Sequence, residues 1–268
     1  ILHAVRGVVT SADNILDRED KGAVKLELGE GRTLRNIMLI LLQNGLIHQV
    51  LQDLAPEDAR LRQRAWSVLI EGLFSIANEE SAEEEDVETV LSPEEILRSI
   101  HSFRGGKLLQ LAFMVPKVFE AHLGDRFEAA MAGIYSIGLA LQILDDVTDL
   151  AEDVQNRNHN VLRSWIVHHG PDGAIPDSDL KARSEAALKS PETTFPKATA
   201  QVVSLALRHA IHGFDRLRDI GYPVDHASSL ELIRMLFRLR GLARLWDFWR
   251  ENGTEPPHMA EFLEQSAC

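Results

Sequence analysis

Apolar residues recur at three- and four-residue spacing along most of this chain of 268 residues. Between Leu34 and Leu54, the apolar positions fall on one side of a helix with 3.6 residues per turn. The sequence contains no useful run with the alternation of apolar and polar residues that marks a half-buried strand. It therefore predicts an all-α fold, formed as a single domain over residues 1–268.

Capping and turn residues divide this pattern into helices. Ser92-Pro93-Glu94-Glu95 is typical of a helix start, with a serine cap, proline in the first turn and an acid at the third position. The acidic stretch 79–88 and the stretch 189–196 are expected to be loops. The predicted helices span residues 34–54, 56–78, 93–105, 106–123, 125–151, 178–188, 198–220, 230–251 and 258–265.

Composition excludes several kinds of partner. The net charge of −13 disfavours nucleic acid and anionic membranes as ligands. The longest notable apolar run, from Ile37 to Leu42, is far shorter than the roughly 20 residues of a membrane span, so stable membrane insertion is not expected. The one cysteine, Cys268, rules out an intramolecular disulfide and favours a reducing compartment such as the cytoplasm.

Two aspartate clusters stand out because each breaks an apolar helical pattern. The first contains Asp13 and Asp17, and the second contains Asp145, Asp146 and Asp149. Acids four residues apart share a helix face and repel each other by roughly 0.2–0.5 kcal/mol per pair. Burial of such a cluster costs far more unless a cation neutralises it. Carboxylate ligands favour a hard divalent metal, which in turn favours a phosphate-bearing ligand.

The second cluster also carries a resemblance to a known family. Its segment reads Gly138-Leu139-Ala140-Leu141-Gln142-Ile143-Leu144-Asp145-Asp146-Val147-Thr148-Asp149. It resembles the GxxFQxxDDxxD motif of the trans-isoprenyl diphosphate synthases, the polyprenyl synthetase family, with Leu141 in place of phenylalanine. Upstream, the segment from Ser92 to Gly106 is similar to the family's segment that ends in Lys-Thr-Gly, with Arg104 at the lysine position. The first cluster falls where the family has its first DDxxD motif.

The resemblance implies a helical bundle around a central cavity, with three Mg²⁺ ions bound when the substrate diphosphate is present. Metal ligands would be Asp13 and Asp17 from one side and Asp145, Asp146 and Asp149 from the other. Arg104 would contact the substrate diphosphate and Gln142 would line the cavity beside the reacting end. The catalytic step that the family performs is ionisation of an allylic diphosphate, and its members are commonly homodimers.

This chain departs from the family at several positions. Asn14 replaces the second aspartate of the first motif. The family's following Arg-Arg-Gly is absent, and Lys21 and Lys25 are candidate diphosphate-binding replacements, although solvated lysines explain them equally well. Only twelve residues precede Asp13. The helices that carry the family's isopentenyl diphosphate motif would therefore lie before Ile1.

Three interpretations follow from this pattern. The first is a divergent prenyltransferase that elongates an allylic diphosphate with the homoallylic isopentenyl diphosphate. The second is an enzyme like the class I terpene synthases, which acts on one allylic diphosphate and cyclises or releases the cation. The third is a catalytically degenerate subunit that regulates a partner synthase.

Overall fold

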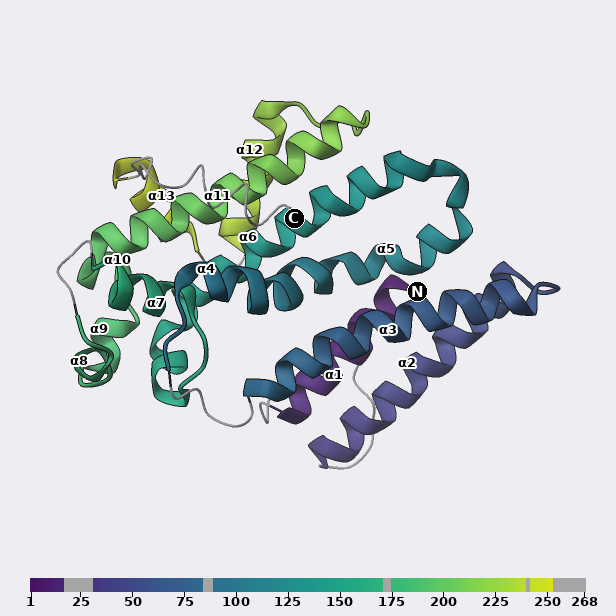
Figure 1. Cartoon of the computed structure of the whole chain (residues 1–268), viewed down its shortest axis with the longest axis horizontal. Coiled ribbons are helices and arrows are strands. Elements are labelled where there is room, and N and C mark those ends of the chain that lie inside the picture. Colours follow the sequence, from purple (N-terminus) through teal and green to yellow (C-terminus); the bar gives the residue numbers. More distant parts are fainter. Residues whose placement is uncertain (17–30, 84–88, 171–174, 240–241, 253–268) are drawn as a thin grey trace. The chain divides into compact units, whose positions relative to one another are not determined.

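The structure, a computed structural model, describes residues 1–16, 31–83, 89–170, 175–239 and 242–252 (Figure 1). Helices make up the regular structure of these residues, and strands are absent from them, which confirms the all-α prediction. The described part of the chain divides into two compact units, one made of residues 1–73 and 111–123 and the other of residues 74–110 and 124–268. The prediction of a single domain over the whole chain stays a prediction.

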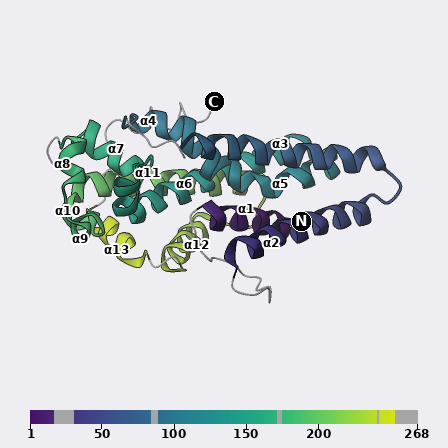
Figure 2. The ribbon, with the colours of Figure 1, turned by 90° about the horizontal axis from the view of Figure 1, so that it is seen from below.

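The first unit contains α1 (Leu2–Leu16), α2 (Arg32–Leu54), most of α3 (Ala59–Glu83) and α5 (Leu108–Phe119). Helices α1 and α2 run antiparallel, side by side in both views (Figures 1 and 2). Two contacts fix this direction. Gly7 lies against the Gln43 side chain, where a Cβ would come within 2.8 Å of Gln43 Cδ. At the other end, Asn14 donates a hydrogen bond to Asn36 across the buried interface (3.3 Å).

The second unit is built around α6 (Gly124–Asn156) and α11 (Pro196–Asp219), which lie side by side (Figures 1 and 2). Two glycine pairs allow close packing of α6 on its neighbours. A Cβ on Gly133 would lie 2.8 Å from the Gly213 carbonyl of α11, and one on Gly138 would lie 2.2 Å from the Gly105 carbonyl of η1 (Ile96–Lys107). Only glycine fits at such backbone contacts, so these residues seat α6 between the two helices.

Shorter helices complete the second unit. Helix η1 is π-helical and continues α4 (Pro93–Glu95), whose start shows the predicted capping box between Ser92 and Glu95. The remaining helices of this unit are α7 (Val161–His168), α8 (Asp177–Lys181), α9 (Glu185–Leu188), α10 (Pro191–Thr194), α12 (His226–Leu239) and α13 (Ala243–Asn252). The short η2 (Ala121–Leu123), which precedes α6, belongs to the first unit.

Several predicted boundaries were wrong. Helix α3 begins at Ala59 because Asp58 accepts a hydrogen bond from Leu61 N as a capping residue (2.9 Å). It continues to Glu83, through the first part of the expected acidic loop, since glutamate and alanine are good helix formers.

Other differences lie further along the chain. The helix predicted over residues 178–188 is divided into α8 and α9, and α10 lies within the expected loop 189–196. The helix predicted over residues 230–251 is two helices, α12 and α13. Helix α7 was not predicted at all. The helix predicted over residues 258–265 lies outside the described residues.

The stretch Ala121–Asn156 is long and apolar enough to cross a membrane by length and composition. Half of its most apolar window is buried inside the structure. Core helices of soluble proteins share this composition, so the stretch is weak evidence for a membrane location. The expectation that the run from Ile37 to Leu42 is the longest notable apolar stretch was therefore wrong, because Ala121–Asn156 is longer.

Candidate functional site

The aspartates of the second cluster lie on α6 in different surroundings. The helix is continuous through the cluster, so Asp145 and Asp149 lie one turn apart on the same side, as their spacing predicts. Asp149 is exposed and Asp145 is partly buried. Asp146 is buried, with 3% of its surface exposed, because one residue turns the helix by about 100° and directs this side chain toward η1.

The Asp146 carboxylate joins three helices. Its Oδ2 lies 2.8 Å from His101 Nε2 of η1 and accepts a hydrogen bond from the backbone N–H of Val161, the first residue of α7. Its Oδ1 lies 3.4 Å from Gln142 Nε2, one turn earlier on α6. Both the imidazole N–H and the N-terminus of α7 stabilise a negative charge at this position. Asp146 therefore holds η1 and α7 against α6, a structural role that the sequence did not predict.

Asn160 extends this buried polar group toward the end of α6. Its side-chain oxygen caps α7 by accepting from Arg163 N (2.9 Å). Its side-chain nitrogen donates to the Asp146 carbonyl and to Asp153 Oδ2, each at 2.7 Å. Asn158 donates to the other oxygen of Asp153 at 3.2 Å. The connection between α6 and α7 is thus ordered by side-chain amides that satisfy buried acceptors.

Asp153 has the most perturbed carboxyl group of this region. Burial, with added repulsion from Asp146 and Asp149, raises the pKa of Asp153 to about 7, although the hydrogen bonds from Asn160 and Asn158 oppose the change. Near neutral pH this carboxyl is therefore protonated in a substantial fraction of molecules. The region carries less negative charge than its count of aspartates suggests.

The packing of Gly105 on α6 brings Arg104 and Gln142 to the same part of the second unit. Gly105 packs on α6 so closely that a Cβ would lie 2.5 Å from the Gly138 carbonyl and 2.9 Å from Gln142 Cβ. The two motifs that carry the family resemblance therefore pack against each other through their glycines. This places Arg104, next to Gly105, beside the helix that bears Asp145.

The Arg104 guanidinium has an acidic neighbour that the sequence did not predict. Its Nε lies 3.4 Å from Glu79 Oε2, and the two side chains are only 16% and 14% exposed. Glu79 comes from the acidic stretch that was expected to be a solvated loop. A diphosphate that binds to Arg104 must therefore share it with Glu79 or displace Glu79.

The first cluster is only partly described. Asp13 is exposed on α1, whereas Asn14 is buried and hydrogen-bonds Asn36. Asn14 thus acts as a helix-packing residue in the first unit. Asp17, together with the candidate lysines Lys21 and Lys25, lies outside the described residues. Asp13 and Asp145 belong to different units, so the convergence of the two clusters around one cavity stays a prediction.

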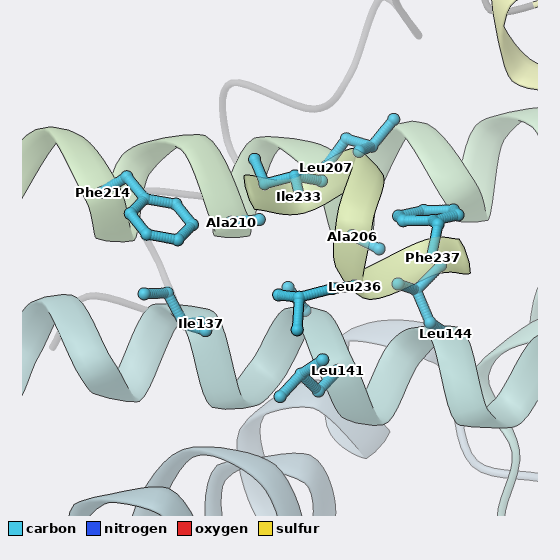
Figure 3. Close-up of a pocket in the computed structure, with 11 residues that line it drawn as sticks. Ile137, Leu141, Leu144, Ala206, Leu207, Ala210, Phe214, Ile233, Leu236 and Phe237 are labelled. Carbon is cyan, nitrogen blue, oxygen red and sulfur yellow. The ribbon is translucent and has the colours of Figure 1, made fainter. Parts of the chain in front are cut away.

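A small apolar pocket lies between α6, α11 and α12 of the second unit (Figure 3). It has a cavity volume of about 20 Å³ and is lined only by apolar side chains of α6, α11 and α12. Leu144 and Phe237 lie toward one end, and Ile137 and Phe214 toward the other (Figure 3). Leu141 also lines the pocket and precedes Asp145 by four residues, so the two share one side of α6. Its complete lining is Ile137, Ala140, Leu141, Leu144, Ala206, Leu207, Ala210, Phe214, Ile233, Leu236 and Phe237.

Two buried histidines and a buried arginine were not identified as important from the sequence. Arg163 is 2% exposed and forms a bidentate pair with Asp177 at 2.9 and 3.0 Å. His101 is 1% exposed, and among the described residues its Nδ1 has no hydrogen-bond partner. Burial, with repulsion from His212 and His101, lowers the pKa of His209 to about 4. The only available signal was the position of His101 one turn before Arg104.

Those predicted Mg²⁺ ligands that the structure describes do not form a complete site by themselves. Among the described residues, no three histidine, cysteine, aspartate or glutamate side chains are grouped to hold a metal ion. The chain was compared with models of known protein families, with curated proteins and with solved structures, and none of the three comparisons finds a match.

Proposed function

We propose that the chain binds an allylic isoprenoid diphosphate together with Mg²⁺ and acts as a prenyltransferase on it. The observation that carries this proposal is the position of the apolar pocket. Leu141 of the pocket lies one turn before Asp145 on the same side of α6, so an apolar tail and a metal-bound head group would have adjacent sites on one helix. A long hydrocarbon with a charged end is the ligand class that suits both.

The described donor atoms are compatible with Mg²⁺. Mg²⁺ keeps several waters and is commonly held by one or two carboxylates plus substrate phosphates, without an all-protein cage. Asp145 and Asp149 supply two hard oxygen ligands near solvent, one turn apart. Asp146, which the resemblance assigns to the metal, has Oδ2 engaged by His101 and Val161. When bound, Mg²⁺ would neutralise the diphosphate and favour its departure.

Different residues of the chain would bind the diphosphate head group and the prenyl tail of the substrate. Asp145 and Asp149 would orient the head group through the metal, and Arg104 would bind the diphosphate directly in place of Glu79. The pocket would hold the tail and exclude water from the allylic carbons, which protects a carbocation from hydrolysis. Its cavity volume is about 20 Å³, so the lining side chains must move apart to admit a prenyl chain.

Calorimetry with geranyl diphosphate and farnesyl diphosphate at millimolar Mg²⁺ tests the proposal. We expect binding that is lost with EDTA and weakened at least about tenfold by Asp145→Asn, with Asp247→Asn on α13 as the control. A pocket-filling variant, Ala206→Leu, should weaken farnesyl diphosphate binding while inorganic diphosphate still binds. If neither prenyl diphosphate binds the wild-type chain, the proposal fails.

Product analysis separates the possible reactions. Incubation with an allylic diphosphate and isopentenyl diphosphate should yield a longer diphosphate if the chain elongates. A hydrocarbon or alcohol formed without isopentenyl diphosphate would assign a terpene synthase-like reaction instead.

A second candidate function is a regulatory subunit without its own activity. Two observations favour this candidate. Arg104, the expected diphosphate-binding residue, is paired with Glu79. Asp146, an expected metal ligand, is hydrogen-bonded to other residues of the chain. This candidate predicts no turnover by the isolated chain and altered product length when it is added to an active prenyl diphosphate synthase. Turnover by the purified chain alone would exclude it.

A further inference from the structure

The Arg104–Glu79 pair has a looser geometry than the Arg163–Asp177 pair, which lies in the same unit. The distance from arginine Nε to the carboxylate oxygen is 3.4 Å in the first pair and 2.9 Å in the second. Charge-assisted hydrogen bonds of this kind are usually about 2.7–2.9 Å long. Arg104 is also 16% exposed, whereas Arg163 is 2% exposed. Arg163 is therefore enclosed in the core, while a dissolved anion can compete with Glu79 for Arg104.

The backbone beside Arg104 is fixed on α6, whereas Glu79 lies near a helix end. Gly105 packs so closely on α6 that a Cβ would lie 2.5 Å from the Gly138 carbonyl. Glu79 lies four residues before Glu83, the last residue of α3. The helix dipole disfavours a carboxylate near a C-terminus, and the last turn of the described helix α3 contains no basic residue. An anion that binds to Arg104 therefore displaces the Glu79 side chain and leaves the guanidinium in place.

A diphosphate is an anion that can complete this exchange. A guanidinium binds two oxygens of a phosphate group at once, and a diphosphate carries more negative charge than a carboxylate. The Glu79 carboxylate also repels any anion that approaches Arg104, in a chain whose net charge is already −13. Glu79 therefore opposes diphosphate binding both by pairing with Arg104 and by its charge.

We propose that Glu79 is an internal competitor, which pairs with Arg104 in the absence of ligand and lowers the affinity of the chain for diphosphates. When a diphosphate binds, the carboxylate leaves Arg104, so one ion pair is exchanged for another. The apparent affinity is reduced according to the fraction of molecules in which Glu79 pairs with Arg104. This inference rests on the proposed diphosphate site at Arg104, and it names a regulation of that site.

Calorimetry with inorganic diphosphate at millimolar Mg²⁺ tests the inference. Glu79→Gln keeps the size of the side chain and removes its charge, so it should bind at least about fivefold more tightly than wild type. Glu71→Gln, which changes an exposed glutamate of the same helix, is the matched control and should bind like wild type. In an Arg104→Gln background, Glu79→Gln should no longer strengthen binding at this site, because the competition acts through Arg104.

A chemical measurement tests the pairing without a diphosphate. The reaction of Arg104 with phenylglyoxal, measured by mass spectrometry relative to the exposed Arg98, should be faster in Glu79→Gln than in wild type. Circular dichroism shows whether each variant is folded. If Glu79→Gln does not fold, Glu79→Asp, whose shorter side chain moves the carboxylate away from Arg104, should give a smaller change in the same direction.

The outcomes separate the inference from the proposed function. Equal affinity of wild type and Glu79→Gln for inorganic diphosphate, or binding by neither, overturns the inference, and so does an unchanged phenylglyoxal rate. If Glu79→Gln binds inorganic diphosphate more tightly but the wild-type chain binds no prenyl diphosphate, the inference holds and the proposed function fails. If wild type and Glu79→Gln bind prenyl diphosphates equally well, the proposed function holds and the inference fails.

Discussion

Substitution of Asp153 by asparagine should change how the stability of the protein depends on pH. The pKa of Asp153 is about 7 in the folded chain, against an ordinary value of 3.8. Between these pH values the folded chain retains a proton that the unfolded chain has lost. The contribution of Asp153 to stability is therefore greatest at low pH and decreases as the pH rises toward 7. At about 1.4 kcal/mol per pKa unit, the decrease between pH 5 and pH 8 is about 2–3 kcal/mol.

Urea unfolding followed by circular dichroism at pH 5, 6, 7 and 8, with EDTA present, measures this effect. The free energy of unfolding is compared between the wild-type chain, Asp153→Asn and the control Glu152→Gln, which changes an exposed neighbouring carboxyl. Because other titrating groups are common to both proteins, their effects cancel in the difference. We expect the stability of Asp153→Asn relative to wild type to rise by about 2–3 kcal/mol from pH 5 to pH 8.

The same titration can refute the reasoning. A difference between wild type and Asp153→Asn that is constant from pH 5 to pH 8 would mean that the carboxyl is ionised throughout. The amides of Asn158 and Asn160 would then stabilise the charged form more than burial disfavours it. An equal pH dependence in Glu152→Gln would likewise show that the effect is not specific to Asp153.

Three further predictions concern the second unit. Gly105→Ala places a Cβ 2.5 Å from the Gly138 carbonyl and should lower the free energy of unfolding by about 1–3 kcal/mol in urea. Arg163→Ala removes the buried bidentate partner of Asp177, which keeps Lys181 at 2.7 Å, and should cost about 1–3 kcal/mol, which thermal unfolding would reveal. The pKa of His209 is about 4, so neutral His209 loses its stabilising contribution as the pH falls below 6.5. His209→Leu should therefore remove about 2 kcal/mol of acid destabilisation between pH 7 and pH 5.

Helical periodicity was sufficient to predict the long helices and the capping box at Ser92. It failed where helices are short or polar. Helix α7 depends on the Asn160 cap and on Asp146, a residue 15 positions before the first residue of the helix, Val161. The acidic end of α3 has the composition of a loop but consists of residues with high helix propensity. Neither feature produces an apolar repeat.

Helical periodicity also predicted part of the candidate site. Four-residue spacing correctly placed Asp145 and Asp149 on one side of α6. Asp146 was grouped with them because it is adjacent in the sequence, although a neighbouring residue in a helix points about 100° away. The partners of Asp146, His101 and Val161, come from other helices. The partner of Arg104, Glu79, comes from an acidic stretch that was expected to be a solvated loop. Such contacts between distant segments leave no local pattern in a sequence.

The inward orientation of Asp146 determines how an alanine scan of the second cluster should be interpreted. An inactive Asp146→Ala protein would leave the ring of His101 and the first turn of α7 without their shared acceptor, so it would report on folding before it reported on ligand binding. These two hydrogen bonds are accepted by Asp146 and not by Asp145, one residue earlier. Loss of ligand binding in a folded Asp145 variant is therefore the informative result, and the two adjacent aspartates form an internal pair of test and control.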